Sequence, residues 1–246
     1  MTTIKLNIDG VDYTCTPPPP PFGLILLPAG VTPVITNLDA LAWQGTKDEA
    51  TPGAATFNTA YPVAIGGKQA RSFSNKYTNG AGVRFSCIYE PSGDTASTHF
   101  IYAGYLWIDD PSQIAQMELD NNQVTADGKT YIFGCQANAN DNSWDITRMT
   151  PNSNWVPSGQ STNPQKWPAK QWMRFEVMSH RDNAGNVTYD QIYFNGVTMP
   201  VGKTLPSAQK LGWDVGRLLT NWQLGGVSGK SGLILTYGSG IQVAKW

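Results

Sequence analysis

Charged side chains are scarce in this sequence. Only 14% of the 246 residues are Asp, Glu, Lys or Arg, whereas roughly 25% is typical of soluble domains. The 17 basic and 18 acidic residues almost cancel, which leaves a formal net charge of −1. The chain therefore has no basic field that would attract a phosphate backbone, and we expect no nucleic-acid partner.

Long apolar runs are lacking as well. The longest covers residues 22–31, about half of the roughly 20 residues that a membrane-spanning helix needs, and Pro28 interrupts it. We interpret this run as a buried strand and expect no membrane contact. Residues 1–5 show none of the features that open a signal peptide. Asn, Gln, Ser, Thr and Gly nevertheless dominate, as in many secreted β proteins, so we expect an extracellular or cell-surface location.

Cysteine and histidine are few. Three cysteines allow at most one intramolecular disulfide, and their spacing matches no zinc site. With only two histidines, a His/Cys metal centre is not expected. Cys87 and Cys135 each lie two positions after a phenylalanine on an expected strand, on the same face, and are predicted to be buried thiols. Cys15 could bridge to the main domain or to another chain.

Calcium binding stays open, because aspartates supply suitable oxygen donors but no loop motif selects among them. The candidate donors are Asp109, Asp110, Asp141 and Asp145.

The N-terminus differs in pattern from the rest of the chain. Residues 4–8 and 11–15 alternate apolar with polar side chains on either side of an Asp-Gly turn, which predicts a β-hairpin. Five prolines at 17–21 then form an extended rod. An isolated hairpin is barely stable, so we expect it to dock on its own domain or on a neighbouring chain. The expected units are the hairpin (1–16), a proline-rich linker with the apolar strand (17–34) and the main domain (35–246).

From Ile35 onward, short segments rich in β-branched and aromatic residues recur between turn signals such as Asp-Gly and Asn-Gly. No stretch keeps a 3.6-residue apolar period for three turns. Nine Trp, ten Tyr and eight Phe are available to build a core. We therefore predict an all-β fold, an antiparallel β-sandwich. The expected strands are residues 83–89, 99–108, 114–123, 130–138, 172–181, 187–194 and 232–237.

One expected strand, residues 114–123, carries acidic side chains on a single face. Because side chains alternate along a strand, Met117 and Leu119 point to the core, and Glu118 and Asp120 point to the opposite face. One face of this strand is therefore core, and the other is polar.

The neighbouring strand fits the same pattern. A hairpin turn centred on Asp127 sets Gln136 opposite Glu118 and Ala137 opposite Met117. Polar residues then meet polar ones, and apolar residues meet apolar ones. This agreement supports the register, because a slip of one residue would mix the two kinds.

A family resemblance rests on these residues. Residues 118–123, Glu-Leu-Asp-Asn-Asn-Gln, resemble the Glu-x-Asp-x-x-Glu signature of laminarinase- and lichenase-type β-glucanases, which share the concanavalin A-like jelly roll with legume lectins. Residues 172–178 and 189–196 look like the strand pair that follows in this fold. The set is also similar to uncharacterised secreted bacterial proteins of this group. The resemblance covers residues 36–246 as architecture and implies a jelly roll whose concave sheet face carries the site.

The sequence departs from the enzyme pattern at one position. The resemblance implies that Glu118 is the nucleophile and that Asp120 tunes it, but Gln123 stands where the acid/base carboxyl belongs. An amide cannot cycle a proton near neutral pH, so double displacement fails unless another carboxylate reaches in. We therefore expect no catalysis. Carboxylates that leave the enzyme alternative open are Asp109, Asp110 and Glu176.

The remaining polar surface suits sugars, because amides and carboxylates bind hydroxyls and aromatic rings support the apolar faces of pyranoses. We predict a non-catalytic, lectin-like protein with a polysaccharide or glycan as partner. Two alternatives stay open: a glycoside hydrolase, and a structural subunit that self-associates through residues 1–16. Trp155 and Trp167 are placed on an exposed loop. Expected ligand contacts are Gln116, Glu118, Asp120, Gln123 and Gln136, with Trp107, Trp144 and Trp172 as aromatic platforms.

Overall fold

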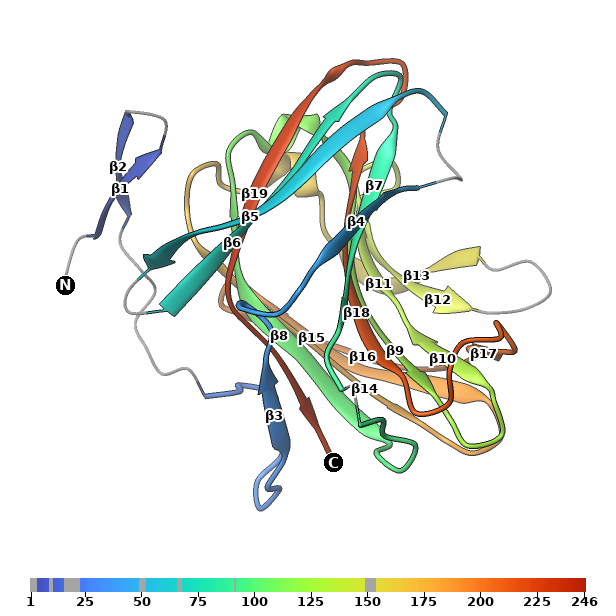
Figure 1. The fold of residues 1–246 in the computed structure, drawn as a ribbon. Coiled ribbons are helices and arrows are strands. Elements are labelled where there is room, and N and C mark those ends of the chain that lie inside the picture. The colour runs from blue at the N-terminus through green and yellow to red at the C-terminus, as the bar shows by residue number, and fades with distance from the viewer. Residues whose placement is uncertain are drawn as a thin grey trace.

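Two antiparallel β-sheets face each other in the computed structural model (Figure 1). The structure describes residues 4–8, 11–15, 23–48, 52–65, 68–90, 92–148 and 154–246. The first sheet comprises, in spatial order, β13 (Asn154–Ser161), β12 (Ser143–Arg148), β11 (Cys135–Asn138), β9 (Ile114–Val124), β18 (Leu218–Gly226), β7 (Gly82–Ile88) and β4 (Gln44–Lys47), with β10 (Thr130–Phe133) beside β9 and β17 (Ala208–Gln209) beside β10. The second comprises β16 (Val197–Pro206), β15 (Asn186–Phe194), β14 (Met173–Arg181), β8 (His99–Ile108), β19 (Gly232–Lys245), β6 (Lys68–Tyr77) and β5 (Ala55–Ile65), with β3 (Val34–Asn37) beside β19. The predicted all-β antiparallel sandwich is confirmed.

Helical structure in the described part of the chain is confined to two short 3₁₀ turns, η1 (Pro111–Gln113) and η2 (Pro164–Lys166). Each begins with a proline and is capped by the side chain before it, Asp110 and Asn163 respectively. Within the described residues, no helix is long and apolar enough to cross a membrane.

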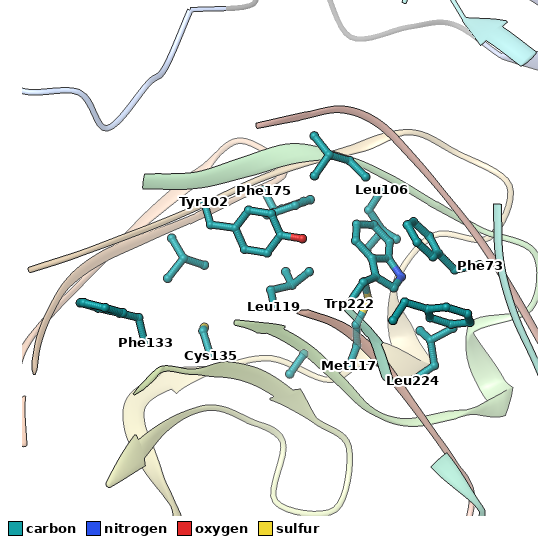
Figure 2. Close-up of a cluster of buried hydrophobic side chains, with 14 of the residues drawn as sticks. Phe73, Tyr102, Leu106, Met117, Leu119, Phe133, Cys135, Phe175, Trp222 and Leu224 are labelled. Carbon is teal, nitrogen blue, oxygen red and sulfur yellow. The ribbon is translucent and has the colours of Figure 1, made fainter. Parts of the chain in front are cut away.

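The core lies between the two sheets (Figure 2). Trp222 of β18 stacks on Phe73 of β6 with ring centroids 4.8 Å apart and meets the edge of Phe175 of β14 at 6.0 Å. Met117 and Leu119 of β9 are buried in the same cluster. Aromatic pairs of this kind contribute about 0.5–1.5 kcal/mol each beyond the burial of their area. These contacts hold the first sheet against the second and fix which face of β9 points outward.

The predicted pairing beside β9 is confirmed. Gln136 lies opposite Glu118 and Ala137 opposite Met117 in the ladder between β9 and β11. The expected strand 130–138 is divided at Gly134, and its first part, β10, pairs with β9 in the same register.

The N-terminal hairpin is present as a separate two-stranded sheet. β1 (Ile4–Ile8) pairs antiparallel with β2 (Val11–Cys15). The side chains of the hairpin, including that of Cys15, and the prolines at 17–21 lie outside the described residues. The docking of the hairpin therefore stays a prediction.

The apolar run that follows the prolines is not the strand that the sequence predicts. Residues 23–33 form no strand, and only Leu26 among them is fully buried, in a small apolar cluster with Ile101 on the outer face of the second sheet. The N–H groups of Ile25 and Leu26 both donate to the Glu176 carboxylate at 2.9 Å. The carboxylate thus supplies the partners that a neighbouring strand would have given. We call residues 23–27 the strap.

Two cysteines are buried free thiols, as expected. Burial raises the pKa of Cys87 to about 12, although the charge of Arg71 opposes the shift. Burial also raises the pKa of Cys135 well above its usual value. Both thiols therefore stay protonated and unreactive at neutral pH.

Candidate functional site

The predicted acidic pair lies on the outer face of the first sheet. Glu118 and Asp120 alternate along β9 with the buried Met117 and Leu119, and therefore point away from the core. Glu118 is half-buried, whereas only 6% of Asp120 is exposed. We call this outer face, described row by row below, the polar face.

Glu118 belongs to a row of hydrogen-bonding side chains that crosses six strands. The Gln223 amide donates to Glu118 Oε1 and, at 3.4 Å, to Asp48. At the other end, the Asp145 carboxylate accepts from Gln136 at 3.5 Å. The cross-strand register gives the order, from β4 to β12, Thr46, Arg84, Gln223, Glu118, Gln136 and Asp145.

Gln116 begins a shorter row beside the first. It lies opposite Asn138 of β11, which donates to Asp145 at 2.9 Å. The Ser143 hydroxyl also donates to Asp145. With Gln136 included, three donors therefore occupy the oxygens of this buried carboxylate.

Asp120 lies in a second row parallel to the first. The Ser86 hydroxyl donates to Asn221 at 2.8 Å, and both Asn221 and the backbone N–H of Cys135 bond to Asp120. Asp120 Oδ1 is buried and has no hydrogen-bond partner among the described residues. The order of the row is Gln44, Ser86, Asn221, Asp120 and Gly134.

Trp155 of β13 stands at the end of the second row. Its neighbour Val156 packs against the core, so alternation turns the half-buried Trp155 to the polar face. A Cβ at Gly134 would lie 3.1 Å from Trp155 Cη2, which places the indole over the glycine. The sequence predicts a loop here, whereas residues 154–161 form β13. A strand holds the indole more firmly than a loop would.

The carboxyl groups of Glu118 and Asp120 resist ionisation. Burial, followed by the nearby charges of Asp120 and Asp48, raises the pKa of Glu118 well above its usual value, and Arg84 opposes the shift. Burial raises the pKa of Asp120 to about 7, despite the hydrogen bond from Asn221. Among the described residues, no basic side chain forms an ion pair with either group. Near neutral pH the pair therefore retains a proton and can both donate and accept hydrogen bonds.

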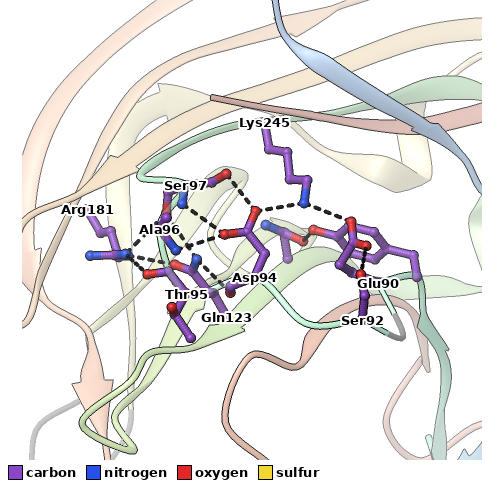
Figure 3. Close-up of polar contacts among 11 residues, drawn as sticks. Glu90, Ser92, Asp94, Thr95, Ala96, Ser97, Gln123, Arg181 and Lys245 are labelled. Carbon is purple, nitrogen blue, oxygen red and sulfur yellow. Dashed lines mark hydrogen bonds and ion pairs between the residues drawn. The ribbon is translucent and has the colours of Figure 1, made fainter.

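Gln123 does not reach the polar face. It is fully buried, and its amide donates to the carbonyls of Asp94 and Ser97 while its oxygen accepts from Arg181 Nε at 2.6 Å (Figure 3). The ladder along β9 has no bulge between residues 117 and 123. An offset of five residues from Glu118 therefore puts Gln123 on the opposite face. It anchors the loop before β8 instead of facing a ligand.

The three predicted aromatic platforms are also absent from the polar face. Trp144 is 1% exposed and packs in the core against Trp167 and Phe194. Trp107 belongs to β8 of the second sheet and is 1% exposed. Trp172, just before β14 of the same sheet, is 8% exposed. Trp167, predicted to be exposed, is covered as well.

The carboxylates that left the enzyme alternative open are engaged elsewhere. Glu176 pairs with Arg174 on the second sheet at 2.7 Å. Asp109 pairs with Lys170 at 3.4 Å, and Asp110 caps η1. In the described ranges, no group of three or more His, Cys, Asp and Glu residues could hold a metal ion.

Several solved structures resemble this chain in fold. An endo-β-1,4-glucuronan lyase from Trichoderma reesei is 12% identical, with 87% of this chain and 95% of that chain covered and a TM-score of 0.49. A Bacillus licheniformis β-glucanase is 10% identical, with 88% of this chain and 98% of that chain covered and a TM-score of 0.40. The third is a family 11 carbohydrate-binding module from Clostridium thermocellum, in complex with a β-1,3-1,4-mixed-linked tetrasaccharide. It is 13% identical, with 87% of this chain and 96% of that chain covered and a TM-score of 0.38. No family model and no curated protein matches the sequence.

These matches are likenesses of fold. The expected resemblance to jelly-roll proteins of the β-glucanase kind is confirmed at that level. With identities of 13% or less and TM-scores below 0.5, the matches carry no argument about activity or ligand. The function of the polar face has to be argued from its own residues.

Proposed function

We propose that the polar face binds carbohydrate without cleaving it. The observation that carries this proposal is the pair of parallel rows of amide, carboxyl and hydroxyl side chains that ends at the half-buried Trp155. Sugar hydroxyls both donate and accept, which matches side chains such as Gln223 and Glu118. The apolar face of a pyranose ring packs on an indole. A polysaccharide ligand fits an extracellular or cell-surface location, which we propose with it.

The charges of the polar face favour a neutral glycan over an acidic one. Glu118 and Asp145 lie in the first row and Asp120 in the second, and Arg84 is the nearby basic group that acts on Glu118 and Asp120. A uronic acid would add a further carboxylate to this group. Like charges at close range cost free energy, most of all where burial already disfavours ionisation.

Binding measurements on two variants test the proposal. Trp155→Ala removes the aromatic platform, and Gln223→Ala removes the donor to Glu118. Each is expected to raise the Kd for a bound neutral glucan at least tenfold, the equivalent of about 1.4 kcal/mol. Isothermal titration against neutral and uronic-acid polysaccharides measures the effect.

The matched control is Tyr193→Ala, which removes a half-buried ring from the second sheet. Its Kd should equal that of the wild type. If no glycan binds at millimolar concentration, or if Tyr193→Ala weakens binding as much as Trp155→Ala, the proposal fails.

A hydrolase is the second candidate, because a carboxyl with a pKa of about 7, as in Asp120, suits a general acid. Against it, residue 123 is an amide on the wrong face, and Asp145 is occupied by three donors. Release of reducing sugar from β-glucans, abolished in Glu118→Gln, would establish the enzyme. We expect no release from the wild type.

A further inference from the structure

A third row on the polar face is apolar except for one amide. After Asp120, the next outward-facing residue of β9 is Asn122. Leu219 of β18 lies opposite Asn122 on one side, and Ile132 of β10 lies opposite it on the other. Leu219 in turn pairs with Ile88 of β7. The residues on either side of Ile88 in sequence are buried in the core, so Ile88 points outward. It is 50% exposed, and Leu219 and Ile132 are half-buried. The row thus reads Ile88, Leu219, Asn122, Ile132.

Asn122 is the anomaly in this row. It is only 2% exposed, and its Oδ1 atom has no hydrogen-bond partner among the described residues. One position along the same face, Asp120 Oδ1 is equally buried and equally unpartnered. Buried acceptors are normally satisfied, and leaving one without a donor costs free energy. Two such atoms on one face point to a ligand that supplies donors.

The surroundings of the two acceptors differ. Asp120 lies among polar side chains of the second row, next to Asn221 and within reach of Trp155 over Gly134. Asn122 lies between the aliphatic side chains of Leu219 and Ile132. A donor that reaches Asn122 must therefore be attached to an apolar group, whereas a donor that reaches Asp120 need not be.

We propose that the polar face recognises 2-acetamido sugars, with the acetamido N–H donated to Asn122 Oδ1 and its methyl group packed on the aliphatic row. This inference rests on the proposed carbohydrate binding and names its substrate class. A ring hydroxyl then donates to Asp120 Oδ1. Neighbouring strands lie about 4.8 Å apart, and same-face residues along a strand about 6.7 Å, so both acceptors fall within reach of one substituted pyranose. Leu219 and Ile132, which flank Asn122, are only half-buried, and the proposal requires them to move aside when the ligand binds.

Other sugars match the row less well. A 2-hydroxyl could donate to Asn122, but it brings no apolar group to the aliphatic side chains. A free 2-ammonium group would place a charge among Leu219, Ile132 and Ile88, where desolvation disfavours it. The acetamido group alone combines a donor with a methyl.

The experiment compares three β-1,4-linked tetrasaccharides by isothermal titration in buffer with chelator: N-acetylglucosamine, glucose and glucosamine oligomers. We expect the acetamido oligomer to bind at least tenfold more tightly than the glucose oligomer. Ile88→Ser should reduce this preference at least threefold. Asn122→Ala should bring the preference below twofold.

Leu233→Ser is the matched control, because Leu233 is 53% exposed on β19 of the second sheet. It should keep the full preference. Equal binding of the acetamido and glucose oligomers, or tighter binding of the glucosamine oligomer, overturns this inference and leaves carbohydrate binding intact. The absence of binding to any oligomer overturns both. Ile88→Ser keeps the test decisive if Asn122→Ala does not fold, because the side chain of Ile88 is half-exposed.

Discussion

Replacing Asp120 by Asn should stabilise the protein at alkaline pH. Burial raises the pKa of Asp120 from its usual 3.8 to about 7, so the folded state favours the protonated acid. The associated stability is present below pH 4 and is lost as the pH rises to about 7. The full shift corresponds to about 4 kcal/mol. Asn removes the charge for good and keeps a side-chain oxygen that can accept from Asn221 and from the Cys135 N–H.

We expect a smaller net gain than the full shift. Glu118 remains in the variant, and the two groups share protons in the wild type. A gain of about 1–3 kcal/mol at pH 8 is therefore expected, or about 3–10 °C in Tm for a domain of this size. At pH 4, where Asp120 is already neutral, the variant and the wild type should melt within about 1–2 °C of each other.

Thermal and urea denaturation of both proteins between pH 4 and pH 9 measure the difference. Asp141→Asn serves as the control, since Asp141 is exposed in the turn between β11 and β12. Its Tm should follow that of the wild type at every pH. An Asp120→Asn protein less stable than the wild type at pH 8, or a difference that does not change with pH, would refute the reasoning.

Three further predictions follow from contacts elsewhere. Gly134→Ala should cost about 1–3 kcal/mol, because its Cβ would lie 2.4 Å from Thr147 Cγ2, and the loss is read from urea denaturation. Lys245→Met removes the ammonium that lies 2.7 Å from Asp94, and denaturation at pH 7 should show a loss of about 2–4 kcal/mol. If the N-terminal hairpin mediates self-association, deletion of residues 1–21 should convert an oligomer to a monomer in light scattering; a monomeric full-length protein would remove that hypothesis.

The features that sequence reasoning found are local ones. Alternation along residues 114–123 and the turn centred on Asp127 are short-range signals, and they placed Glu118 opposite Gln136 as observed. Asn221 and Gln223 were missed because their strand, β18, joins β9 from about 100 residues further along the chain. Within a sequence, nothing local marks such a pairing.

Two errors have separate physical causes. The Glu-x-Asp-x-x-Glu motif placed Gln123 on the same face as Glu118. In a strand without a bulge, residues five positions apart point to opposite faces, so counting along the strand would have put Gln123 on the core face. Trp144 was judged by residue type alone. Its burial depends on Trp167, just after η2, and on Phe194 of β15, which cannot be recognised as neighbours before the fold is known.

The strap sets the direction in which the chain enters the domain. Glu176 holds residues 25 and 26 against the outside of the second sheet, while the polar face looks out from the first. Residues 25 and 26 therefore lie on the back of the sandwich, with the full thickness of both sheets between them and Glu118. A partner that bound the outer face of the second sheet at the strap would leave the polar face accessible, so the two faces of the sandwich can bind different molecules at the same time.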